Sequence, residues 1–322
     1  MILITGCESY LGGKLANRLL YDGYKVKCLD EMRPKNISSQ FEFIQASLSE
    51  YGKLKNACHG VDTIFHFMDI KSSKKLSRKK MKQMNVKYVN NLLDIAEKAG
   101  VRRLIFLSSY EVYGRSKQIP TRFDDKKKPI TAYGKDKFKA EKLCMEKLKK
   151  GKMEIIIFRP ALICGPEVRN PKILITLFMA LGMDDANRFF IAGDGHTRFQ
   201  MLHPDDALNA FVKAIDTPDI NGKVYNLGSD YVMTQKEQVE KIVYDLNVYC
   251  EIKYISPLKA RLLSILLRPF KINYLTKDHL LFLLNNVLLD CQKAKDELKW
   301  EPQKNNIQII KETIEWYRTE KL

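Results

Sequence analysis

Short apolar runs alternate with longer helical stretches through the first two thirds of the chain. The runs are rich in β-branched residues, which is typical of strands. They predict strands at 1–5, 25–29, 41–46, 63–68, 103–108 and 154–160. The stretches between them predict helices at 11–22, 50–58, 85–99 and 133–149.

Strands that alternate with helices of this length indicate right-handed crossovers and a parallel sheet covered on both faces. We therefore expect the α/β class and a doubly wound, Rossmann-type sheet. The pattern loosens after residue 166. A helix near 171–181, a loop at 192–200, a helix from Asp205 and a strand at 223–228 precede a region rich in short helices.

The change of pattern predicts two domains. The sheet domain is expected over 1–166, and 192–228 returns to it. A smaller, partly interleaved C-terminal lobe, expected to bind substrate, takes mainly 167–191 and 229–322.

Charge and cysteine content narrow the class of protein. The 55 basic and 38 acidic residues give a net charge of +17, which reflects either a lysine-rich surface or a preference for anionic ligands. Seven scattered cysteines without a CxxC pair favour a reducing compartment, so we expect a cytoplasmic protein. No spacing of His or Cys indicates a metal site.

We expect neither a signal peptide nor a membrane span. A strand expected at the first residue leaves no room for a signal peptide, and no apolar run is long enough to span a bilayer.

The segment TGCESYLG follows the first expected strand and opens a helix, which is the context of a dinucleotide-binding turn. Gly6 allows the chain to turn tightly, and Gly12 lets the helix pack closely on the strand. Ser9 replaces the middle glycine. We expect its hydroxyl to donate to a phosphate at the helix N-terminus.

Asp30 ends the second expected strand, where a carboxylate accepts from the adenosine ribose hydroxyls and repels a 2′-phosphate. This favours NAD over NADP. The alternative is that Asp30 only caps its strand and that Arg33 serves a 2′-phosphate.

Tyr133 and Lys137 stand four positions apart at the start of a helix, so both side chains project from one face. An ammonium beside a phenol stabilises the phenolate and lowers its pKa, which suits a general base. Ser108 and Ser109 follow the strand RLIFL and reach the carboxyl edge of the sheet, where ligands bind in this architecture. A Tyr-x-x-x-Lys pair alone is weak evidence, but here the serine, the glycine turn and Asp30 accompany it.

At this point the chain resembles the extended short-chain dehydrogenase/reductase family, the NAD-dependent epimerase/dehydratase group, over nearly its whole length. The motifs that carry the resemblance are TGCESYLG, VDTIFHF, NVKYVNNLLDIA, RLIFLSSYEVYG, YGKDK, FRPALICGP, AGDGHTRFQMLHPDDA, VYNLGS and LDCQKAKDELKWEP.

The resemblance implies a hydride shuttle with NAD as cofactor. Tyr133 moves a proton to or from a substrate hydroxyl, Lys137 lowers the pKa of Tyr133 and holds the nicotinamide ribose, and Ser109 bonds the same substrate oxygen. Glu111 stands where the family's dehydratases and decarboxylases carry a glutamate that takes a proton beside a transient ketone. The alternative is that Glu111 is a surface carboxylate, or one that only supports the site from behind, in a simple epimerase or dehydrogenase.

The same resemblance implies two sets of binding residues. Substrate is expected at Ser109, Glu111, Tyr133 and Arg198, the last as a clamp on a diphosphate, although the family usually places that arginine where Phe199 stands. NAD is expected at Gly6, Ser9, Tyr10, Leu11, Gly12, Asp30, Leu48, Phe67, Met68, Asn85, Lys137 and Pro160.

Several departures from the family cluster around the cofactor. Ser47 replaces an aspartate, and Met68 and Asp69 replace small alanines. An added carboxylate beside a pyrophosphate is expected to be repulsive. Together with Ser9 and the replacement of a helix glycine by Tyr88, these changes leave open a non-catalytic protein with an NAD fold.

The leading hypothesis is an NAD-dependent epimerase or dehydratase that acts on a nucleoside-diphosphate sugar. Its rival among enzymes is a hydroxysteroid-like or other alcohol dehydrogenase, since FRPALICGP lacks the asparagine of many sugar-nucleotide epimerases. The basic run at 71–83 is expected to be a solvated loop and lacks the aromatic residues of a nucleic-acid site. The apolar, basic stretch at 256–275 is expected to pack on its own lobe rather than on a membrane. A homodimer is expected from the resemblance alone.

Overall fold

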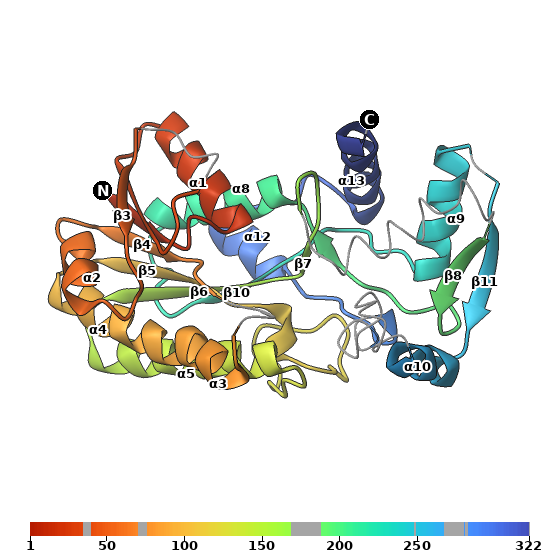
Figure 1. Ribbon diagram of the computed structural model, residues 1–322, viewed down its shortest axis with the longest axis horizontal. Helices are drawn as coiled ribbons and strands as arrows, with labels where there is room; N and C mark the ends of the chain where they lie inside the picture. The colour runs from red at the N-terminus through yellow and green to blue at the C-terminus, as the bar shows by residue number, and fades with distance from the viewer. Residues whose placement is uncertain are drawn as a thin grey trace.

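Seven parallel strands form the central sheet, in the order β10-β6-β5-β4-β1-β2-β3 (Figure 1). The computed structural model describes residues 1–34, 40–69, 76–168, 188–247, 249–266, 280 and 283–321. Every neighbouring pair in the sheet is parallel, so the expected doubly wound sheet is confirmed. The strands are β1 (Ile2–Thr5), β2 (Val26–Asp30), β3 (Glu42–Gln45), β4 (Thr63–His66), β5 (Arg103–Leu107), β6 (Glu154–Pro160) and β10 (Val224–Leu227).

Helices cover both faces of the sheet, as Figure 1 shows. Each face has its own apolar cluster, because the strand side chains alternate between the two faces. One face is covered by α1 (Tyr10–Tyr21), α8 (Pro204–Asp216) and α12 (Gln292–Leu298). The other is covered by α2 (Tyr51–Cys58), α4 (Tyr88–Lys98) and α5 (Ala132–Lys150).

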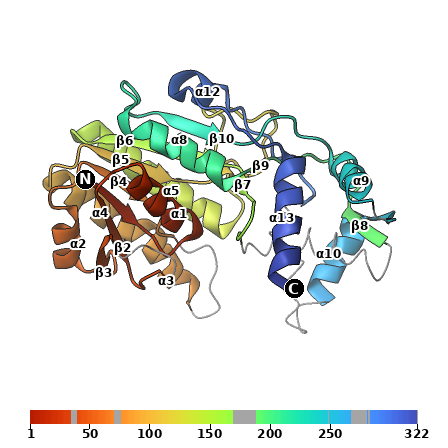
Figure 2. The same ribbon diagram turned by 90° about the horizontal axis from the view of Figure 1, so that it is seen from above.

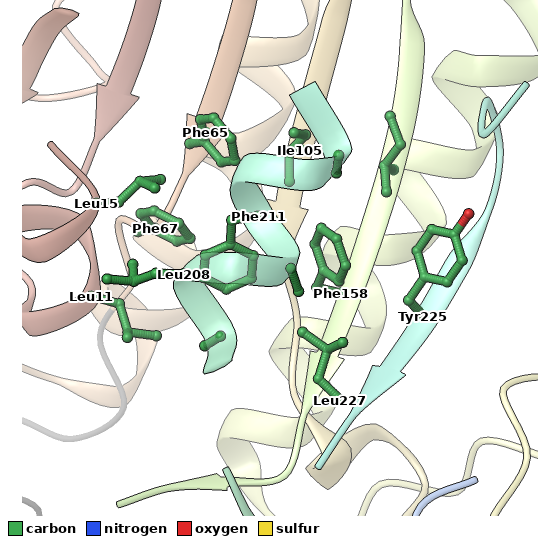
Figure 3. Close-up of a cluster of buried hydrophobic side chains, with 14 of the residues drawn as sticks. Leu11, Leu15, Phe65, Phe67, Ile105, Phe158, Leu208, Phe211, Tyr225 and Leu227 are labelled. Carbon is green, nitrogen blue, oxygen red and sulfur yellow. The ribbon is translucent and has the colours of Figure 1, made fainter. Parts of the chain in front are cut away.

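Phe211 of α8 lies at the centre of the first cluster (Figure 3). Its ring centroid is 5.3 Å from that of Phe67, beyond the end of β4, and 5.2 Å from that of Phe158 on β6. Phe158 also lies 5.7 Å from Tyr225 on β10. These contacts hold the helix across the carboxyl half of the sheet, and removal of such a buried ring costs about 3–5 kcal/mol.

The smaller lobe lies beside the carboxyl edge of the sheet (Figure 2). It contains a parallel pair that the sequence pattern did not predict, β8 (Arg188–Ala192) with β11 (Glu251–Ile255), and the helices α9 (Gln235–Asp245), α10 (Pro257–Leu266) and α13 (Asn306–Lys321). A second short pair joins β7 (Leu162–Ile163) to β9 (Met201–Leu202). The helix expected near 171–181 lies outside the described residues, as does part of the stretch 256–275.

Asn306, the first residue of α13, connects this helix to β9 and to the chain that follows β10. Its Oδ1 accepts from the Met201 backbone N–H (3.0 Å) and from Ser229 Oγ (2.7 Å). Its Nδ2 donates to the Phe199 carbonyl at 2.7 Å. The side chain is 1% exposed, so these bonds replace solvent entirely and fix the start of the last helix.

The basic run at 71–83 is only partly the loop that we expected. Residues 71–75 lie outside the described residues, and Arg78–Lys82 form the short helix α3, capped by Ser77. A π-helical turn, Gln83–Lys87, continues α3 into α4. Among the helices that the structure describes, none has both the length and the apolar character needed to cross a membrane.

Candidate active site

The order of the strands reverses between β1 and β4, and the chain leaves both strands at the same edge of the sheet. In doubly wound sheets this switch point is where ligands bind. Gly6, just after β1, has φ +87°, and a Cβ there would lie 2.3 Å from the Met68 backbone nitrogen. Only glycine therefore allows the turn after β1 to pack against the end of β4.

Ser9 caps α1 in the first turn. Its Oγ accepts from the Gly12 N–H at 3.2 Å and donates to the Gly6 carbonyl at 2.5 Å. A Cβ at Gly12 would lie 2.2 Å from that carbonyl oxygen. The Ser9 hydroxyl therefore stabilises the turn internally, and in this structure its proton is already used. The role that we expected for it, as a donor to phosphate, stays a prediction.

Asp30 links the end of β2 to the first turn. Its two carboxylate oxygens accept from the backbone N–H groups of Glu8 (2.9 Å) and Glu31 (2.8 Å). Burial raises the pKa of Asp30. Beside it, a cleft of about 440 Å³ is lined by Glu31, Gln45, Ala46, Ser47, Glu50 and Lys53. Arg33, the alternative partner for a 2′-phosphate, is exposed and lies over the ring of Phe43.

The structure brings Tyr133 and Lys137 together with Asp69, which follows β4. Thr131 caps α5, so the helix begins at Ala132 and projects both side chains toward the sheet edge. Tyr133 Oη donates to Asp69 Oδ2 at 2.7 Å, and Lys137 Nζ lies 2.6 Å from the same oxygen. Lys137 Nζ also donates to the Leu107 carbonyl at the end of β5 (2.6 Å).

Our expectation for the pKa of Tyr133 is wrong in this structure. Burial raises the pKa of the phenol well above its usual range, and the charges of Asp69 and Glu111 raise it further. The sequence indicated a lowered pKa because Lys137 is the neighbour on the same helix face. The Asp69 carboxylate offsets that ammonium and accepts a hydrogen bond from the phenol, so the neutral phenol is favoured.

Ser109 and Glu111 follow β5 and lie in and beside a short 3₁₀ turn, Tyr110–Val112. Ser109 Oγ accepts from the Glu111 N–H at 3.2 Å. Glu111 is 6% exposed, and its Oε2 accepts from Thr131 Oγ1, the cap of α5, at 2.6 Å. Ser109 and Glu111 are therefore held at the edge of the sheet that carries Tyr133.

Two residues beside the site, Asp136 and Arg78, were not found from the sequence. Asp136 is adjacent to Lys137 and is 1% exposed, and its carboxylate accepts two short hydrogen bonds from the Arg78 guanidinium, at 2.5 and 2.6 Å. The predicted residue Asn85 lies in the π-helical turn, with Nδ2 3.5 Å from the same carboxylate. Such turns are frequent at functional sites. The aspartate in YGKDK was the available signal, but its partner Arg78 is distant in sequence.

The other predicted cofactor residues are spread along the same edge. Tyr10 Oη donates to the Pro166 carbonyl at 2.6 Å. Pro160 ends β6 beside Leu227 of β10. The remaining residues are Leu11, Leu48 and Phe67, which are buried, and Met68, which is partly buried.

Arg198 is not brought to this group by any described contact. Its side chain is exposed, and its backbone N–H bonds to Asn286 Oδ1 at 2.7 Å. Phe199, which stands where the family usually has the arginine, is buried in an apolar cluster that also contains residues of β7, β9, α9 and α13. The expected diphosphate clamp stays a prediction.

A family model places the chain among known proteins. The model of the NAD dependent epimerase/dehydratase family matches residues 2–228. The chain therefore belongs to this family of NAD-dependent enzymes. This confirms the resemblance expected from the motifs.

Individual relatives agree with the family. UDP-N-acetyl-alpha-D-glucosaminuronate decarboxylase of Bacillus cytotoxicus is 24% identical and covers 98% of this chain and 97% of its own length. dTDP-D-glucose 4,6-dehydratase of Mus musculus is 24% identical, with 98% of this chain and 88% of the relative covered. The solved structure of UDP-glucuronic acid 4-epimerase from Bacillus cereus in complex with NAD has a TM-score of 0.78 at 20% identity and covers 99% of each chain. This likeness supports the fold.

Proposed function

We propose that the chain is an NAD-dependent epimerase or dehydratase of nucleoside-diphosphate sugars. The observation that carries the proposal is the meeting of Tyr133 and Lys137 with the chain after β4, at the switch point of the sheet. A proton-transfer group at that edge faces the place where a dinucleotide binds in this architecture. The named relatives act on sugars linked to UDP or dTDP, and the substrate class is inferred from them.

The residues present fit NAD. Gly6 and Gly12 present no side chain in the first turn, at the N-terminus of α1, where a pyrophosphate would bind. Asp30 and Glu31 offer carboxylates to ribose hydroxyls and disfavour a 2′-phosphate. Asp69, which we expected to repel the pyrophosphate, is paired with Lys137, so its charge is offset.

The turn residues Gly6 to Gly12 would hold the pyrophosphate, Asp30 the adenosine ribose, and Lys137 with Asn85 the nicotinamide end. The remaining apolar contacts would come from Leu48, Phe67, Met68 and Pro160. When bound, NAD supplies a hydride acceptor that returns the hydride within the same catalytic cycle.

Each catalytic side chain then has one task. Tyr133 exchanges a proton with the substrate hydroxyl that is oxidised, and Ser109 bonds the same oxygen. Glu111 removes a proton from the carbon next to the resulting ketone, which is the step that eliminates water in a dehydratase. Thr131 keeps the Glu111 carboxylate in place at 2.6 Å.

Thermal shift followed by turnover tests the proposal. The panel is NAD, NADP, UDP-glucose, UDP-glucuronic acid and dTDP-glucose. We expect NAD to raise the melting temperature and NADP to leave it nearly unchanged, because a ligand at 100 times its Kd adds about 2.7 kcal/mol to the free energy of unfolding. We also expect at least one nucleotide sugar to raise it further and to be converted.

The other outcomes select the alternatives. A response to NAD with turnover of an apolar alcohol, and none with any nucleotide sugar, identifies an alcohol dehydrogenase. The absence of any response to NAD identifies a non-catalytic member of the family. A Glu111→Gln variant that still epimerises but no longer eliminates water assigns the elimination step to Glu111.

A further inference from the structure

The Asp69 carboxylate lies between Tyr133, which transfers a proton in the proposed reaction, and the ammonium of Lys137. Asp69 leaves the end of β4 and turns its side chain toward α5, where its Oδ2 meets both Tyr133 Oη (2.7 Å) and Lys137 Nζ (2.6 Å). The Asp69 side chain is 22% exposed and that of Lys137 is 2% exposed. One carboxylate oxygen therefore accepts a hydrogen bond from the phenol and pairs with a buried ammonium.

This arrangement favours the neutral form of the Tyr133 phenol over the phenolate. Lys137 directs its ammonium to Asp69 and to the Leu107 carbonyl, so its charge is already compensated on two sides. A carboxylate that accepts from a phenol stabilises the neutral phenol over the phenolate. Among the residues that the structure describes, the other ionisable groups that act on this cluster are Glu111 and Tyr110 after β5 and His66 at the end of β4.

Resting on the proposed function, we propose that Asp69 is the proton acceptor behind Tyr133. Asp69 keeps Tyr133 a neutral phenol and receives its proton when Tyr133 takes one from the substrate hydroxyl. Tyr133 is then a relay that is neutral before and after the transfer. The group that becomes protonated, and so loses its negative charge, is the Asp69 carboxylate.

The transfer balances in atoms and electrons. The O–H bond of the substrate breaks as a new O–H bond forms on Tyr133 Oη, and the original Tyr133 O–H bond breaks as one forms on Asp69 Oδ2. The electron pair of the substrate C–H bond leaves as the hydride that NAD accepts in the proposed function. The return of the hydride reverses both proton transfers and regenerates the Asp69 carboxylate.

Titration of Tyr133 in the protein without ligands tests the first half of the proposal. The near-ultraviolet absorbance of tyrosinate is followed with pH in the parent and in Asp69→Asn, each compared with the same protein carrying Tyr133→Phe. The difference isolates Tyr133. We expect its pKa to fall by more than one unit in Asp69→Asn, a more than tenfold change in proton affinity, because Lys137 is then uncompensated.

The control is Asp62→Asn, a carboxylate at the opposite end of β4 that pairs with Arg102. It should leave the titration of Tyr133 unchanged. If Asp69→Asn does not fold, Asp69→Ala provides the comparison, since alanine is the residue that the family usually carries there. Equal titration of Tyr133 in the parent and the Asp69 variants overturns the proposal whatever the activity.

The pH profile of kcat/KM tests the relay itself. In the parent, the acid limb should lie in the range of a carboxylate, well below the ionisation of Tyr133. In Asp69→Asn the acid limb should move up to the measured pKa of Tyr133. At pH 6, kcat/KM of this variant should therefore be at least tenfold below the variant's own maximum.

An acid limb of the parent that coincides with the ionisation of Tyr133 overturns the relay. If no nucleotide sugar is converted at all, the proposed function fails, and the titration still decides whether Asp69 controls the proton of Tyr133.

Discussion

Tyr133 has two neighbours with different effects. The Lys137 ammonium is one helical turn away, with Nζ 5.7 Å from the ring centroid, whereas Asp69 bonds the phenolic oxygen directly. Burial raises the pKa of the Tyr133 phenol, and the charge and the direct hydrogen bond of Asp69 raise it further, so the neutral phenol is favoured despite the Lys137 ammonium. The phenol is thus an oriented proton donor whose oxygen is held by the sheet.

Replacement of Tyr133 by Phe removes that oxygen and leaves the Asp69–Lys137 ion pair in place. We expect kcat to fall by roughly 10²–10⁴-fold, while the thermal shift produced by NAD is retained. Tyr231→Phe is the control, since Tyr231 is 88% exposed. A kcat of Tyr133→Phe equal to that of the parent would show that Tyr133 does not carry the proton.

At the scale of the element, α1 begins with a side-chain N-cap, Ser9, which the glycine usual in the family could not provide. Ser9 satisfies the Gly12 N–H, and five residues of α1 are buried against the sheet. The replacement of glycine by serine therefore gives the first turn an internal hydrogen bond. The chain loses the glycine that would face a phosphate, but the serine cap stabilises the first turn of α1.

Removal of this cap should destabilise the whole protein. We expect Ser9→Ala to lower the free energy of unfolding by about 1 kcal/mol and Ser9→Gly by only a few tenths, measured by urea denaturation. Ser77→Ala is the matched control, because Ser77 caps the five-residue α3, which has no buried residues. Equal losses for Ser9→Ala and Ser77→Ala would contradict the importance of the first turn.

At the scale of the whole molecule, a buried histidine links stability to pH. His66 ends β4 at the centre of the sheet, with Nδ1 2.6 Å from Thr5 Oγ1 and its ring stacked on Phe106. Burial, assisted by the charge of Lys137, lowers the pKa of His66 to about 3. The unfolded chain, with a histidine pKa near 6.5, binds this proton more readily.

Stability should therefore fall as the pH falls from about 6.5 to 3, by up to roughly 1.4 kcal/mol per pH unit from this residue. Denaturation at a series of pH values from 7 to 4 measures the slope. His66→Gln should flatten it, and His59→Gln, at an exposed position, should not. An unchanged slope in His66→Gln would assign the acid sensitivity to other groups.

The period of apolar residues predicted the strands of the large sheet, because burial on two faces leaves a local pattern. The spacing of Tyr133 and Lys137 on one helix predicted that they lie together. It did not predict the partner of Tyr133, since Asp69 is 64 positions away and is polar. The bond between Arg78 and Asp136 spans 58 positions and was missed for the same reason. The strand β11 was missed because all five of its residues are half-buried or exposed.

Asn306 has a consequence for the order in which the molecule is completed. Its bonds to Phe199 and Met201 span 107 and 105 positions. Asn306 is therefore synthesised more than a hundred residues after these two partners. Contacts of such sequence separation form late, because a long loop must close first. During synthesis the smaller lobe therefore stays open after the large sheet has its strands, and α13 closes it last.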